Sequence, residues 1–106
     1  MITEEQVKSA AVNAGFPDRY REAFVMGLLH NLNIFNEWVH LLTPDIVVRW
    51  LALGMYLAER ENFSRPQLFE VLVKFVTELF TDPEQQAVAL AAVNVLKEMI
   101  ELADSH

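Results

Sequence analysis

The feature that most constrains the fold is the run of residues 46–58, in which Arg49 carries the only charge. A helix made of this run has almost no polar face, so other parts of the chain must cover it on several sides. Residues 43–45 (Thr-Pro-Asp) precede the run. They supply an N-cap, a proline at the first helical position and a carboxylate at the positive end of the helix dipole. We therefore expect a central helix over about 44–61, with the other helices packed around it.

Gly54 lies inside this helix, where glycine costs roughly 1 kcal/mol of helix propensity relative to alanine. That cost predicts that a neighbouring backbone crosses closely at Gly54. A thin polar line, interrupted at Ala52 and Leu53, follows the helix: Asp45, Arg49, Tyr56 and Arg60. We interpret this line as the solvent-facing edge, with Asp45 and Arg49 at the spacing of a surface ion pair. The alternative is a buried Arg49 that binds an anion or a carboxylate in a cleft.

The length and composition predict one helical domain over 1–106 with more apolar residues than it needs. Apolar residues make up 53% of the chain. Soluble domains usually contain about 45–50%, and that range already includes glycine. A chain this small has a high ratio of surface to volume, so we expect a homo-oligomer or a bound partner helix to cover the excess.

Charge and residue usage disfavour several classes of partner. The net charge is −7 and the eight Lys and Arg residues are scattered, which argues against nucleic acid and anionic membranes. Without cysteine the chain has no disulfide, thiol chemistry or Cys-ligated metal. No apolar run reaches the ~20 residues that span a bilayer. The N-terminus lacks the layout of a secretory signal, so we expect a cytoplasmic protein.

Helix-start and helix-stop signals divide the first part of the chain. Thr3 begins a first helix with a capping-box pattern, and Gly15 is placed to end it. A second helix follows from residue 18. We expect a break near 31–33, where asparagines compete with the helix, and then a short helix to Leu42. The alternative is one unbroken helix over 18–42.

Two more helices complete the expected fold. Ser64 is placed to cap a helix whose apolar face consists of Leu68, Leu72, Phe75, Val76 and Leu79. A long C-terminal helix, about 83–103, is apolar on more than half of its circumference, and we expect Leu90 on its outer side. No segment has strand or hairpin signals. The sequence therefore predicts an all-α, compact bundle of five or six helices.

Glu37 and His40 form the only pattern that suggests a metal. An E-x-x-H pair places a carboxylate and an imidazole on one helix face, and di-iron bundles use two such pairs with two further glutamates. One pair could complete a site only across the two-fold axis of a dimer. The simpler interpretation is a solvent-side pair, so we expect no metal and no cofactor.

Aromatic residues gather in the sequence around the start of the central helix: Phe35, Trp38, Trp50 and Tyr56. They could form a groove with aromatic anchors for a ligand or a partner helix. We prefer the interpretation that they form a corner of the core, because all four fit the apolar stripes. The candidate binding residues are therefore three of these aromatic residues, Trp38, Trp50 and Tyr56, together with Leu90 on the outer side of the last helix.

The sequence contains none of the common nucleophile or phosphate-loop motifs. We therefore expect a non-catalytic interaction protein (a small adaptor, regulator or chaperone-like protein) that pairs with itself or with another protein through apolar helix faces. One alternative is a bundle that binds a small apolar or aromatic ligand between the central and last helices. The second alternative is the dimer-assembled metal site at Glu37 and His40.

Overall fold

The computed structural model describes residues 1–41, 43–59 and 65–104, with side chains from residue 68 in the last of these ranges. Helices account for the regular structure of these ranges, and no strand occurs in them. The elements are α1 (Glu4–Ala14), α2 (Asp18–His30), α3 (Leu32–Trp38), the 3-10 helix η1 (Val39–Leu41), α4 (Pro44–Ala58), α5 (Arg65–Leu79) and α6 (Pro83–Asp104). The all-α bundle expected from the sequence is confirmed, with principal extents of 34 × 27 × 22 Å.

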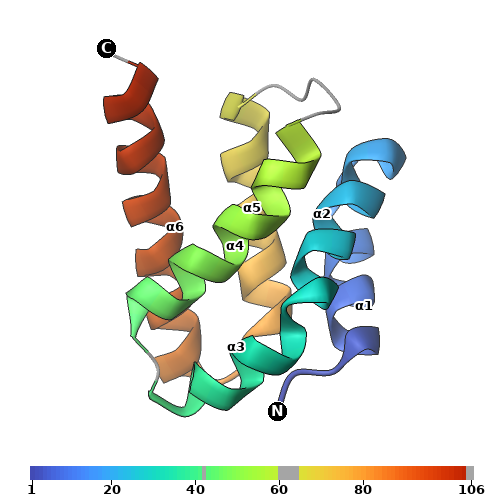
Figure 1. Ribbon diagram of the computed structural model, residues 1–106, viewed down its shortest axis with the longest axis vertical. Helices are drawn as coiled ribbons and strands as arrows, with labels where there is room; N and C mark the ends of the chain where they lie inside the picture. Colours follow the sequence, from blue (N-terminus) through green and yellow to red (C-terminus); the bar gives the residue numbers. More distant parts are fainter. Residues whose placement is uncertain (42, 60–64, 105–106) are drawn as a thin grey trace.

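Five of the helices form a closed ring of contacts around the core. In order round the ring, α1 packs on α2, α2 on α4, α4 on α6, α6 on α5, and α5 on α1. The short helix α3 contacts α2 and α4 at one end of the bundle. Figure 1 shows α4 crossing the front of the molecule between α6 and α2. One face of α4 packs on the core, and its two flanks contact α2 and α6. The remaining face of α4 is exposed to solvent.

Within the part of the chain that the structure describes, no helix combines the length and the hydropathy that a bilayer crossing requires.

Local chemistry sets most of the described helix ends. The Thr3 hydroxyl accepts from the Gln6 N–H, and the Gln6 side chain accepts from the Thr3 N–H, which confirms the capping box. Gly15 ends α1 in the left-handed region, at φ 85°. Asp82 caps α6, since its Oδ1 accepts from the backbone N–H groups of Glu84 and Gln85. Thr43 is the N-cap of α4, as expected, but its side chain makes no capping hydrogen bond. The cap expected at Ser64 lies outside the described residues.

The chain breaks at Asn31, so the alternative of one helix over 18–42 is wrong. The Asn31 side chain donates to the Gly27 carbonyl at 3.0 Å, and its backbone N–H donates to the Leu28 carbonyl at 3.2 Å. These bonds satisfy carbonyls that have no partner in the last turn of α2. The next helix, α3, is held from its other side, since the Asn36 amide bonds both the N–H and the carbonyl of Ile2.

The core is a single apolar cluster to which α1, α2, α3, α4, α5 and α6 contribute, and no described polar or charged residue is buried in it. Aromatic rings fill its centre. The Phe24 ring lies 4.7 Å from the Phe16 ring and 5.2 Å from the Phe75 ring, measured between centroids. The apolar face expected for α5 is buried at all five positions. Periodicity therefore located this face correctly.

The backbones of α2 and α4 meet at two glycines. A Cβ on Gly27 would lie 2.8 Å from both the Cα of Gly54 and the carbonyl oxygen of Leu53. A Cβ on Gly54 would lie 2.9 Å from the Phe24 ring. The close backbone crossing expected at Gly54 is confirmed.

The structure shows which of the apolar faces of the long helix α6 is buried. Its core face consists of Ala89, Ala92, Val93 and Leu96. Leu90 is half-buried and packs against the core, so its placement on the outer side was wrong. The large apolar residues of α6 that are exposed are Val95, Met99 and Leu102. This helix therefore has two apolar faces, and only one of them meets the rest of the bundle.

We expect Gly27→Ala to lower the free energy of unfolding by roughly 1–3 kcal/mol, the usual cost of overpacking. The added methyl group would meet backbone atoms, which cannot rotate away, and this outweighs the helix propensity gained. Urea denaturation followed by circular dichroism measures the change. Ser9→Ala, at an exposed position of α1, is the control and should change stability by less than about 0.5 kcal/mol. A Gly27→Ala variant as stable as the parent would contradict the close crossing.

The buried phenol of Tyr20 should make the free energy of unfolding fall at alkaline pH. Burial raises the pKa of the Tyr20 phenol well above its usual value, and the Glu59 carboxylate raises it further. Because the folded pKa is above the unfolded one, this contribution to stability is present below about pH 10 and is lost as the pH rises beyond it. Denaturation at pH 8 to 11 should show a smaller alkaline loss for Tyr20→Phe than for the parent. The control Tyr56→Phe, at an exposed ring, should lose as much as the parent.

Candidate functional site

Two adjoining hollows open on the face formed by α2, α3 and α4. One, of about 300 Å³, lies between α3 and α4 and has Asn31 among its lining residues. The other, of about 340 Å³, lies between α2 and α4. Asn31 and Leu53 line both of them. We call the combined depression the α2–α4 hollow.

Large apolar side chains line the α2–α4 hollow and are exposed to solvent there. They come from three helices: Met26 of α2, Ile34 and Trp38 of α3, and Leu53 and Tyr56 of α4. Isolated exposed apolar residues are ordinary on protein surfaces, whereas a contiguous group in a depression is typical of a binding surface. This group makes the hollow the strongest candidate site in the described part of the chain.

Two stacked aromatic rings line the half of the hollow between α3 and α4. The Phe35 and Trp50 rings lie 4.0 Å apart at an angle of 10°. The Trp50 indole N–H donates to the Leu28 carbonyl at 2.9 Å. These contacts join α2, α3 and α4, so the position of the hollow follows from the packing of the bundle.

The core-corner interpretation of the aromatic group is therefore half right. Phe35 and Trp50 are buried, as expected, but Trp38 is 52% exposed and Tyr56 is 62% exposed. Met26 was expected to fill a gap in the core, but it is exposed, and Ile34 was not identified as a candidate. The polar line on α4 could have predicted that Leu53 is exposed. Arg49, Leu53 and Tyr56 recur at i, i+4 and i+7, so they share one exposed face of the helix.

The described lining of the hollow carries one positive charge and no negative charge. Arg49 lines it from α4, while no Asp or Glu does. Arg49 is exposed, which excludes the buried-arginine alternative. The expected ion pair between Asp45 and Arg49, both described residues, does not form. The guanidinium therefore faces solvent beside an apolar surface.

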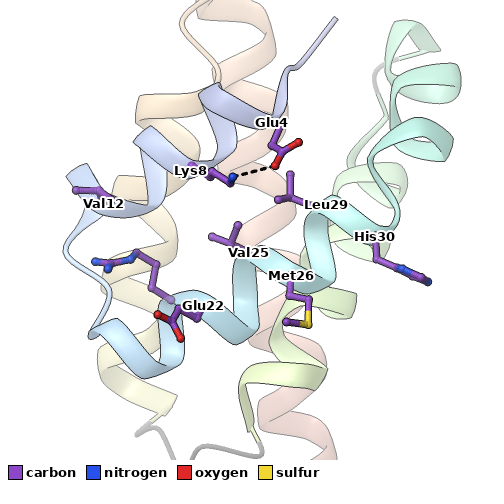
Figure 2. Close-up of a pocket in the computed structure, with 9 residues that line it drawn as sticks. Glu4, Lys8, Val12, Glu22, Val25, Met26, Leu29 and His30 are labelled. Carbon is purple, nitrogen blue, oxygen red and sulfur yellow. Dashed lines mark ion pairs between the residues drawn. The ribbon is translucent and has the colours of Figure 1, made fainter.

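A larger groove, of about 670 Å³, runs between α1 and α2 and meets the hollow at Met26 and His30. Figure 2 shows its side chains, with the ion pair of Lys8 and Glu4 at 2.9 Å across one flank. Charges of both signs line this groove, including Arg21 and Glu22. We interpret it as the solvated seam between two adjacent helices.

Glu37 and His40 are both exposed, on α3 and η1 respectively. Among the residues that the structure describes, no three His, Asp or Glu side chains are grouped as metal ligands would be. A metal site at Glu37 and His40 would need ligands from a second copy, and this alternative stays a prediction.

The ligand alternative places a small molecule between α4 and α6. None of the hollows and grooves described above has lining residues from both helices, and a further groove of about 590 Å³ lies between α5 and α6 instead. A ligand between α4 and α6 therefore stays a prediction without a described cavity to support it.

Searches of protein-family models, curated proteins and solved structures found no significant match to this chain.

Fluorescence of variants with a single tryptophan checks the geometry of the site. In Trp50→Phe the remaining Trp38 should emit as an exposed indole and be quenched readily by acrylamide, at the lowest measurable protein concentration. In Trp38→Phe the remaining Trp50 should emit at shorter wavelength and resist quenching, because it is 2% exposed. Equal quenching of the two indoles would contradict the placement of Trp38 on the rim of the hollow.

Proposed function

We propose that this chain is a non-catalytic interaction protein, an adaptor, regulator or chaperone-like protein, whose working surface is the α2–α4 hollow. The observation that supports this most directly is the group of exposed apolar side chains from three helices that lines one hollow. The lack of a described carboxylate there strengthens the proposal, because a carboxylate would lose its hydration when a partner docked.

The shape and composition of the hollow favour a polypeptide partner over a small molecule. Each half, at about 300 and 340 Å³, is at the small end of the range for small-molecule sites. An amphipathic helix could lie across both halves and place successive apolar side chains on either side of Leu53. Trp38 and Tyr56 on its rim are of the residue types that contribute most to protein interfaces.

The partner in this proposal is either another protein or a second copy of the chain, and nucleic acid and membrane surfaces are disfavoured. The net charge of −7 supports that exclusion. The lack of cysteine fits a reducing compartment, so we propose the cytoplasm as the place of action.

Site-specific photo-crosslinking in cells tests the proposal. A photoreactive phenylalanine analogue is placed at Trp38 or Tyr56, and at Val73 as the control, an exposed residue of α5 outside the hollow. We expect discrete protein adducts from the first two positions, whether with a second copy or with another protein, and a much lower yield from Val73. Equal yields at all three positions, or none, would contradict the hollow as the working surface.

A further inference from the structure

A second exposed apolar surface lies on α6. Ala91, Val95, Met99 and Leu102 are all exposed and recur every three or four residues, so they form one stripe along the helix. At 1.5 Å per residue the stripe is roughly 16 Å long. We call it the α6 stripe.

The α6 stripe borders the same face of the molecule as the hollow. The groove between α5 and α6 is lined from α6 by Asn94, Lys97 and Glu101, so these residues mark the flank of α6 next to α5. By helical periodicity, the buried face of α6 separates these residues from Val95 and Met99, which therefore lie on the other flank of the helix. That flank is next to α4, the other helix that α6 contacts closely. Since α4 lies between α6 and α2 in Figure 1, the stripe and the hollow lie on either side of α4.

The charge in the lining of the hollow and the charges beside the α6 stripe are complementary. The hollow contains the Arg49 guanidinium and no described carboxylate. The α6 stripe is accompanied by Glu84 and Glu98, both exposed, which helical periodicity places beside or in line with its apolar residues. A stripe laid in the hollow would bring carboxylates toward a cation, whereas two hollows laid together would bring two cations together.

We propose that the chain forms a two-fold homodimer in which the α6 stripe of each copy lies in the α2–α4 hollow of the other. This inference rests on the proposed function, because it names the occupant of the same hollow. Two-fold symmetry makes both contacts at once and closes the assembly, so no further copy is recruited. The interface covers Met26, Trp38, Leu53 and Tyr56 with apolar side chains, and it removes Val95 and Met99 from water.

Sedimentation velocity of the purified full chain, from about 1 to 100 µM, tests this pairing. The parent should sediment as a dimer. Leu53→Glu in the hollow and Met99→Glu in the stripe should each raise the dimer Kd at least about 30-fold, because each change removes an apolar contact at the interface and places a carboxylate there. The matched control is Val73→Glu on α5, which should leave the Kd unchanged. Circular dichroism checks that each variant is folded, and Tyr56→Glu or Val95→Glu replaces a variant that is not.

Mixing the two dissociated variants distinguishes this dimer from other arrangements. In a dimer of one Leu53→Glu chain and one Met99→Glu chain, one hollow and the opposite stripe are both intact, so the mixture should associate more strongly than either variant alone. If only one of the two variants dissociates the dimer, like surfaces pair with like and the proposal is wrong. A monomeric parent at 100 µM would also overturn it, while adducts with another protein at Trp38 would still support the proposed function.

Discussion

The structure depends on the contact of two helix backbones at Gly27 and Gly54. With no side chain on either residue, α2 and α4 approach until a single Cβ would meet backbone atoms at 2.8 Å. This approach places the Trp50 indole within reach of the Leu28 carbonyl and directs the chain into α3 just beyond it. The hollow is a consequence of this arrangement, because α3 leaves the bundle at an angle to α4 and the side chains between them do not fill the space.

Helix ends and helix breaks, which depend on residues close in the sequence, could be predicted. Where a helix has two apolar faces, the face that packs on the core could not. The cap at Thr3, the stop at Gly15 and the break at Asn31 follow from local hydrogen bonding, and the structure confirms all three. The close crossing at Gly54 was also predictable, since an unfavourable glycine inside a helix needs a compensating contact. For α5, a single apolar stripe left only one face to bury.

The helix α6 shows where this reasoning fails. Its sequence contains two apolar stripes, and periodicity alone does not determine which of them is buried in the core. In the structure the buried face consists of Ala89, Ala92, Val93 and Leu96, and the longer Met99 lies outside. The same ambiguity affected Trp38 and Tyr56. Both fit an apolar stripe, but the helix that would have covered them is absent from the described part of the fold.

The distribution of charge then explains how an acidic chain can expose so much apolar surface. Its fifteen carboxylates keep most of the surface hydrated and repel chance contacts between copies. The α2–α4 hollow is an exception, since its described lining contains no carboxylate and one guanidinium. The acidic surfaces of two copies repel each other in most orientations, whereas the hollow, which is apolar and positively charged, attracts an apolar surface that carries a carboxylate. Association in that one orientation is therefore favoured over the others. A partner that supplies apolar side chains beside a carboxylate meets both conditions, and the α6 stripe with Glu98 has that composition.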